Sequence, residues 1–363
     1  MTSPDEQALF LEFEQRASTF PDIGVDLYGY GNEDFANTVG SKVAAHLHIF
    51  GKLLNLERLH KVIVAYDYAG ALANLERGVE TRETLTPTKD DLGEGIAMTP
   101  AVLVNDELRS VIVLNAAHMA VLAHDDEPEY AEYRERMIYT IAHECGHVHD
   151  LAMHAKMLPG VIGNMRHQFR DAVLFAIASG CWTEYIASRL SACFGGDFTT
   201  ADYEGTLCSV LEQAKDRADA AIRQYRMHGD RQRLVQQVTG QYHRVMISAS
   251  YLLGHLDGLE KSVEECAPKA TEHIDGTPYF KPYFATLRSE LRAMYETYGE
   301  WKTIEVYEPL KQTAYDLIKN CGLDVQQRGN DGYVDVPFTP ETMPSPEEKA
   351  EFLKLNSAAG SRN

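Results

Sequence analysis

The chain has 363 residues, of which 44% are hydrophobic and 24% are charged. Its 34 Lys and Arg residues against 54 Asp and Glu residues give a formal net charge of −20 at pH 7. A surface this negative repels phosphate backbones and anionic lipid headgroups. We therefore expect a soluble globular protein with no nucleic-acid partner and no membrane partner.

Three features indicate a cytoplasmic location. The first residues, Met-Thr-Ser-Pro-Asp-Glu, are acidic where a signal peptide would be basic. The longest stretch without a formal charge, 110–124, is too short to span a bilayer. The six cysteines include no C-x-x-C pair, which favours reduced thiols.

The first part of the chain mixes helix and strand patterns. Apolar spacing predicts a helix over 5–18, strands near 24–30 and 61–66, and a helix between them over 41–57. Residues 96–103 and 109–115 then form a hairpin signal, and Pro100 argues for an edge position in at least one of its strands.

Beyond Pro128 helical periodicity dominates. The predicted helices cover 128–157, 165–193, 200–227, 230–260, 280–298 and 303–320. From Gly322 the periodicity ends, and Pro340, Pro344 and Pro346 with a Glu/Lys-rich end predict a loosely structured tail. We expect an α+β protein with an N-terminal α/β part over 1–125, a helical part with a metal site over 126–321, and the tail over 322–363.

The stretch 139–150 is the candidate metal-binding and catalytic segment, because it contains H-E-x-x-H on a predicted helix. Residues four apart share a helix face, so His143 and His147 can both direct an imidazole at one ion, with Glu144 beside them. Zinc in a catalytic site takes three protein ligands and keeps one position open. Glu144 would then act as general base, taking a proton from the attacking water and returning it to the leaving amine. Cys145 points away from the two histidines and is interpreted as a packing residue.

A third ligand is expected downstream, where three candidates compete. His154 stands at the wrong offset for the extended metzincin pattern, and Asp150 suits a supporting or surface role better. Glu184 is the strongest, because it lies midway along a mostly apolar predicted helix. A carboxylate there has a desolvation cost unless it is paired or binds a metal. An ion pair with Arg189 or another base is the alternative.

These residues resemble the gluzincin type of zincin metallopeptidase, with His143, His147 and Glu184 as the ligand set. Over 110–192 the chain looks most like the intracellular ImmA/IrrE-type metallopeptidases, in which the H-E-x-x-H helix is followed by a helix bearing a Glu and then small and apolar residues, here Glu184-Tyr-Ile-Ala-Ser-Arg-Leu-Ser-Ala. The resemblance implies a zincin-like fold, a Zn²⁺ ion, and a peptide or protein substrate. It also implies a substrate-binding edge strand, for which 111–115 is the candidate; a plain core strand is the alternative.

Other assignments stay open at the sequence level. An oxyanion donor is expected besides the metal, and the candidates are Tyr242, His243, Tyr251 and His255. Asp150 and Asp171 are candidates for orienting the histidines. The basic stretch 215–233 is interleaved with acids and is typical of solvated helices. A catalytically silent zincin-fold binding or regulatory protein, or a zinc hydrolase of a non-peptide amide, are the alternative functions. The substrate, any gating by the tail and the oligomeric state are not encoded in these motifs.

Overall fold

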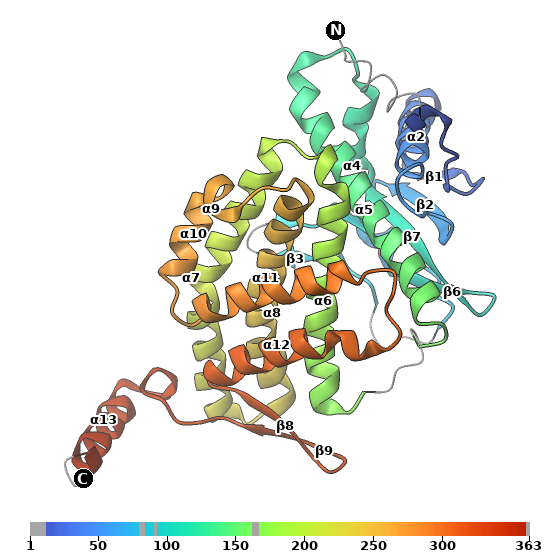
Figure 1. The fold of residues 1–363 in the computed structure, drawn as a ribbon. Helices are drawn as coiled ribbons and strands as arrows, with labels where there is room; N and C mark the ends of the chain where they lie inside the picture. The colour runs from blue at the N-terminus through green and yellow to red at the C-terminus, as the bar shows by residue number, and fades with distance from the viewer. Residues whose placement is uncertain (1–11, 80–83, 91–92, 162–166, 361–363) are drawn as a thin grey trace. The chain divides into compact units, whose positions relative to one another are not determined.

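The computed structural model describes residues 12–79, 84–90, 93–161 and 167–360 (Figure 1). The chain divides into two compact units. The first comprises Met1–Asn164, Ile186–Thr199 and Asp257–Leu259, and the second comprises Met165–Tyr185, Thr200–Leu256 and Glu260–Asn363. The α+β class is confirmed, but the predicted boundary at 125/126 is wrong. The helix with the H-E-x-x-H motif packs on the sheet and therefore belongs to the first unit.

A mixed sheet forms the centre of the first unit. Its described strands are β1 (Val25–Tyr28), β2 (Leu59–Ala65), β5 (Ala97–Met98), β6 (Ala101–Val104) and β7 (Glu107–Asn115). β1, β2 and β7 are parallel neighbours, and both β5 and β6 pair antiparallel with β7. A small hairpin of β3 (Lys89–Asp90) and β4 (Gly93–Glu94) lies outside this sheet.

The predicted hairpin is present, but its edge strand is the first one, 97–104, and not the candidate 111–115. β7 is paired on both sides, with β2 and with β5 and β6, so residues 111–115 form a central strand and cannot offer a free edge. The edge is 97–104, which contains Pro100, as its missing N–H group requires. The turn is Asn105–Asp106, whose φ angles of 51° and 63° are those of a type I′ hairpin turn.

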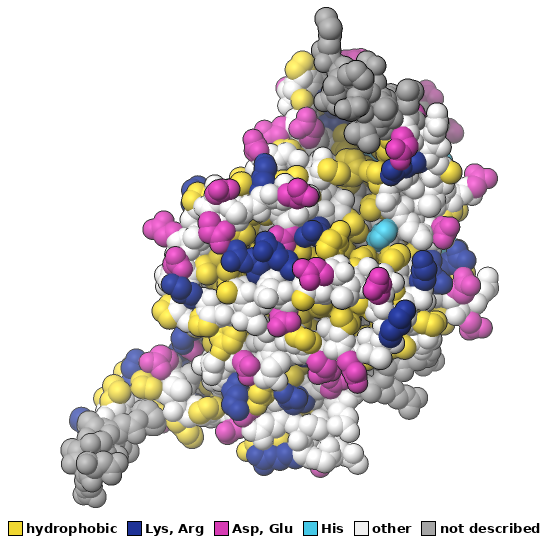
Figure 2. Space-filling model, viewed as in Figure 1, with side chains coloured by type: hydrophobic (Ala, Val, Ile, Leu, Met, Phe, Trp, Pro, Cys, Tyr) yellow, Lys and Arg dark blue, Asp and Glu magenta, His cyan; other side chains and the backbone are white. Residues whose placement is uncertain are grey.

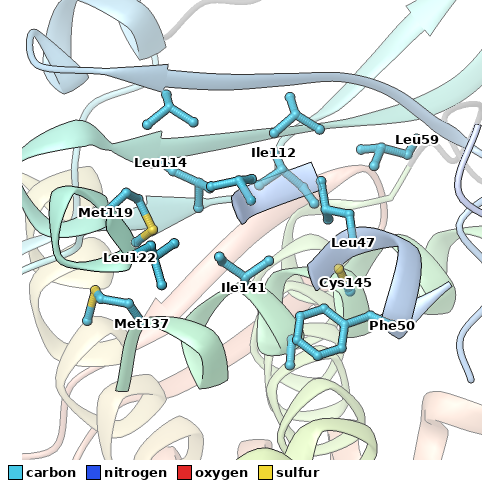
Figure 3. Close-up of a cluster of buried hydrophobic side chains, with 14 of the residues drawn as sticks. Leu47, Phe50, Leu59, Ile112, Leu114, Met119, Leu122, Met137, Ile141 and Cys145 are labelled. Atoms are coloured by element: carbon cyan, nitrogen blue, oxygen red, sulfur yellow. The ribbon is translucent and has the colours of Figure 1, made fainter. Parts of the chain in front are cut away.

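One face of the sheet is covered by α2 (Glu33–Phe50) and α5 (Ala131–Met157). Met137, Ile141 and Cys145 recur every four residues along α5 and belong to one core cluster with Ile112 and Leu114 of β7 (Figure 3). Cys145 is therefore a core residue, as predicted. This apolar stripe fixes the rotation of α5 about its axis, and with it the direction of the motif histidines.

The opposite face of the sheet has a smaller core. Ile63, Ala65, Val111 and Val113 pack there against the short helix α3 (Tyr68–Ala73). Alternation along β2 and β7 explains the division, since successive side chains point to opposite faces. A further short helix, α4 (Ala116–Met119), follows β7 directly.

The predicted helix over 41–57 begins earlier and ends earlier in the structure. Asn32 caps α2, its side chain accepting a hydrogen bond from the Phe35 N–H group, and the two acidic residues that follow favour a helix start. The predicted helix over 5–18 falls largely outside the described residues, of which 12–15 are helical.

The second unit contains most of the long helices. The helices that lie wholly or mainly in this unit are α6 (Phe169–Ser191), which continues into the first unit from Ile186, α7 (Asp197–His228), α8 (Arg231–Gly258), the short α9 (Val263–Cys266) and α10 (Pro268–Asp275), α11 (Lys281–Glu296) and α12 (Glu308–Asn320). The six long periodic segments of the sequence correspond to α5, α6, α7, α8, α11 and α12. Glu204 of α7 accepts hydrogen bonds from the N–H groups of Lys269 and Ala270 and so caps the start of α10.

The tail is more ordered than predicted. It forms a hairpin of β8 (Asp324–Arg328) and β9 (Asp331–Asp335), with β8 beside α12, and ends in α13 (Pro346–Gly360) (Figure 1). Arg223, Arg226 and Arg231 of the basic stretch donate hydrogen bonds to main-chain carbonyls of Glu341, Thr342 and Gly332. These arginines thus bind the tail while staying partly or fully exposed, a contact between distant segments that local patterning does not reveal.

Charged side chains of both signs share the visible face of the molecule (Figure 2). On the face shown in Figure 2, Lys and Arg side chains are interspersed with Asp and Glu over the described elements. Among the helices that the structure describes, none combines the length and the apolarity needed to cross a bilayer.

Candidate metal centre

The side chains of His143, Glu144 and His147 come together on α5. One potential ligand atom from each residue lies within 4.8 Å of the others, and His143 and Glu144 are buried. At about 100° per residue, the two histidines project from a different side of α5 than the stripe that packs on the sheet, and Glu144 stands at the boundary between these sides. The packing of Met137 and Ile141 therefore orients the motif.

The two imidazoles have the geometry of a metal-binding pair. Their Nε2 atoms are 3.1 Å apart, and their ring planes are inclined by 86°. Two nitrogens bound to one tetrahedral zinc at the usual Zn–N distance are about 3.3 Å apart. The observed separation fits that value, and a neutral imidazole nitrogen and a carboxylate oxygen are donors that zinc accepts. His143, Glu144 and His147 can therefore hold a metal ion, whose identity the geometry leaves open.

Glu144 is fixed by a residue from the edge of the sheet. The Thr99 hydroxyl donates a hydrogen bond to Glu144 Oε2 across 2.6 Å, and the Glu144 side chain is nearly buried. Glu144 also acts on Tyr68, because burial and the charge of Glu144 raise the pKa of the Tyr68 hydroxyl. The carboxylate thus lies in a largely dry environment with one strong hydrogen-bond donor.

The remaining polar residues at the end of α5 have structural contacts. His149 Nδ1 accepts a hydrogen bond from the Asn55 N–H group across 2.8 Å, which ties α5 to the loop after α2. His154 and Asp150 are both buried, with 3.1 Å between His154 Nδ1 and Asp150 Oδ1. Burial lowers the pKa of His154, but the Asp150 carboxylate outweighs that effect and raises it on balance. Asp150 is thereby engaged with His154, a partner that the sequence did not suggest.

Glu184 lies on α6 in the second unit and is half-buried. Its charge acts on two neighbours in the same unit, Cys181 and His243. His243 is held close to α6, because a Cβ at Gly180 would lie 2.6 Å from His243 Nε2. Arg189, the suggested partner of Glu184, lies with Nη1 3.4 Å from Asp257 Oδ2.

The four oxyanion candidates have different surroundings. Tyr242 is fully buried beside Tyr279, and His255 is fully buried with its ring 5.8 Å from that of Tyr203. Tyr251 stacks on the same Tyr203. His243 is the candidate on which Glu184 acts electrostatically. Asp171 is bound to His167 and Lys311 in the second unit, and among the described residues these two, not the motif histidines, are its partners.

Thr99 is the site residue that the sequence did not reveal. It precedes Glu144 by 45 positions and belongs to no metal-ligand pattern. The only available signal was its place beside Pro100 in the predicted hairpin, in which Pro100 marked an edge. Set against family models, curated proteins and solved structures, the chain matches none of them.

Proposed function

We propose that this protein is a zinc-dependent metallopeptidase in which His143, His147 and Glu184 bind the metal and Glu144 is the general base. The observation that carries the proposal is the convergence of the two Nε2 atoms at 3.1 Å beside a buried, hydrogen-bonded glutamate. A zincin-like fold, a likeness to ImmA/IrrE-type peptidases and a cytoplasmic location belong to the same proposal and rest on the sequence.

The chain's own residues supply the proton transfers. When bound, a zinc ion polarises the scissile carbonyl and makes water a stronger nucleophile. Glu144 takes the proton that the water loses and delivers it to the leaving amine. Its burial suits this role, because electrostatic interactions are stronger where water is excluded.

Two observations support Glu184 as the third ligand. In the first unit, α6 approaches α5 so closely that a Cβ at Gly146 would lie 2.8 Å from the Cα of Ala187. Glu184 precedes Ala187 by three residues in the same uninterrupted helix, so both lie on one helix face. The carboxylate is also half-buried, so a metal ion bound there would be partly shielded from water.

The edge strand supports an extended peptide as substrate. Every second residue of an antiparallel strand bonds its partner strand, and the Asn115 and Val111 N–H groups donate to the carbonyls of Ile96 and Pro100. The main-chain groups of Ala97, Thr99 and Ala101 therefore point outward, and none has a hydrogen bond to another described residue. Further along, the edge is covered, because the Leu103 N–H group bonds the Arg77 carbonyl. The open edge thus lies beside Glu144 and suits pairing with a peptide main chain.

The test combines metal analysis with one isosteric substitution. We expect purified protein to contain one zinc per chain and to cleave peptides from a proteome-derived library. Glu144→Gln should keep zinc and lose at least about 10³-fold in kcat, since the general base is removed. Glu132→Gln is the matched control, because Glu132 lies on the surface of the same helix and pairs with Arg136. A metal-free protein, or full activity in Glu144→Gln, would refute the proposal.

A further inference from the structure

We infer that Thr99 is a positioning residue that ties the general base to the substrate-binding edge. Its side chain holds the Glu144 carboxylate, and its main chain belongs to the open strand edge that would pair with a peptide. This inference rests on the proposed function and adds a residue and a role that the H-E-x-x-H motif does not contain.

The contact with Glu144 has the length of a strong hydrogen bond. Thr99 Oγ1 is 2.6 Å from Glu144 Oε2 and 3.4 Å from the Glu144 carbonyl oxygen. A hydroxyl has one proton to donate, and O–H···O⁻ bonds of about 2.5–2.7 Å are charge-assisted. The proton therefore goes to Oε2. The other carboxylate oxygen, Oε1, is left to accept the proton of the attacking water.

The position of Thr99 follows from the register of the hairpin. Ala97 is opposite Leu114 and Met98 opposite Val113, so Thr99 is opposite Ile112. Ile112 and Leu114 belong to the core between the sheet and α5, and the Thr99 side chain therefore emerges on the α5 side. A one-residue slip would turn this side chain to the other face. The pairing of β5 with β7 thus directs the hydroxyl at Glu144.

Two local features hold Thr99 in one conformation. The residue before a proline is restricted to extended backbone, and Pro100 follows directly. A β-branched side chain has few χ1 rotamers, so the hydroxyl direction is restricted as well. A donor with so little freedom orients a carboxylate at small entropic cost. The same extended backbone presents the outward N–H and C=O groups of Thr99 to a substrate strand.

Thr99 therefore links the position of the bound peptide to the position of the Glu144 carboxylate, and both must be correct for hydrolysis. The main chain of 97–101 sets the register of a peptide that pairs with the edge. The hydroxyl of Thr99 sets the orientation of the Glu144 carboxylate. Displacing a catalytic group by about 1 Å can cost about 100-fold in rate. Loss of the hydroxyl should consequently lower kcat, while substrate main-chain binding, and with it KM, is retained.

The experiment compares Thr99→Val with Thr99→Ser in the full-length, zinc-loaded protein. Valine keeps the shape and the β-branch but removes the donor, whereas serine keeps the donor. We expect Thr99→Val to lose about 10- to 100-fold in kcat with KM changed less than about threefold. Thr99→Ser should recover most of that loss. Both variants should contain as much zinc as the wild type, because the Thr99 hydroxyl bonds Glu144, and not a histidine, within the described part of the chain.

The matched control is Thr239→Val. Thr239 is a buried threonine whose hydroxyl bonds the Val235 carbonyl within α8, so it reports the general cost of losing a buried hydroxyl. Its kcat should equal that of the wild type. Equal kcat in Thr99→Val and wild type, or equal losses in Thr99→Val and Thr99→Ser, would overturn the inference.

A second measurement separates this inference from the proposed function. In metal-free protein, Thr99→Val should lower Tm in the wild-type background and lower it less in a Glu144→Ala background, because the hydrogen bond is then already lost. If the wild type is inactive, the proposed function fails while this coupling remains. The wild type could instead be active and Glu144→Gln inactive, with Thr99→Val lowering Tm equally in both backgrounds. In that case the proposed function stands and only the role of Thr99 is refuted.

Discussion

Gly146 of α5 and Ala187 of α6 touch so closely that a Cβ at position 146 would lie 2.8 Å from the Cα of Ala187 and 3.1 Å from its carbonyl oxygen. Gly146 directly precedes His147, so this crossing lies within the metal motif. The absence of a side chain at 146 is what allows the approach. The glycine of the motif therefore serves helix packing, at the point where the Glu184 helix meets the histidine helix.

Gly146→Ala should destabilise the protein in spite of the higher helix propensity of alanine. The added methyl group meets backbone atoms, which cannot rotate away, and overpacking of this kind costs about 1–3 kcal/mol. If Glu184 binds zinc as proposed, pushing α6 away should also weaken zinc binding, because Glu184 precedes Ala187 in the same helix. Thermal unfolding of the metal-free and zinc-loaded protein measures both effects.

Gly205→Ala is the control for this substitution. Gly205 lies inside α7, and a Cβ there meets no atom within 4 Å. Alanine should therefore raise the stability by about 0.5–1 kcal/mol, its ordinary advantage over glycine in a helix. Equal changes in Gly146→Ala and Gly205→Ala would show that the crossing at Ala187 is not tight.

Glu184→Gln should lose zinc affinity if the carboxylate binds the ion. The amide has the same size but no charge, so the half-buried site loses a ligand with little change in packing. We expect the affinity to fall by more than about 100-fold, the upper end of what a residue that only supports a ligand contributes. Competition with a chromogenic chelator measures the dissociation constant directly.

Glu290→Gln provides the comparison within the same unit. Glu290 lies on α11 and is half-buried, and burial raises the pKa of its carboxyl group. Neutralising it should leave zinc binding unchanged. A Glu184→Gln protein that binds zinc as tightly as Glu290→Gln would remove Glu184 from the ligand set.

Local patterning predicted the helices and the motif well, but not the pairing of distant segments. His143 and His147 follow from spacing on one helix, and α5 itself from four-residue apolar recurrence. Which strand lies at the edge depends on how β7 pairs with β2, some 50 positions earlier. A run as apolar as 111–115 is typical of a strand covered on both faces and paired on both sides. That property argued for the centre of the sheet, where the strand is found.

The domain boundary failed for a related reason. Periodicity marks where helices begin, and it changes near Pro128, but a domain is defined by which surfaces bury one another. Met137, Ile141 and Cys145 pack on β7, so α5 belongs with the sheet that precedes it. Thr99 was missed because a hydrogen bond over 45 residues has no sequence signature.

His243→Gln should lower kcat without releasing the metal. Among the four oxyanion candidates, His243 is the one on which the charge of Glu184 acts, and burial lowers its pKa, so the ring is neutral and can donate one hydrogen bond. Losing one oxyanion donor costs about 10²–10³ in kcat. Tyr242→Phe should retain full activity, because Tyr242 packs against Tyr279 inside the helical unit. A larger loss of kcat in Tyr242→Phe than in His243→Gln would make Tyr242, and not His243, the oxyanion donor.

The stability of the protein should fall as the pH drops from 6.5 to about 4, and His255 should account for part of this loss. Burial, with the charge of Lys261, lowers the pKa of His255 from 6.5 to about 4. Between these pH values the unfolded chain binds a proton at this site and the folded chain does not, so stability is complete above pH 6.5 and declines towards pH 4. A shift of this size corresponds to about 3 kcal/mol. Urea unfolding of metal-free His255→Asn and His255→Phe should show a decline smaller by that amount. His60→Asn changes an exposed histidine, so its free energy of unfolding should fall with pH as steeply as that of the wild type. Equal pH dependence in all four proteins would contradict the role of His255.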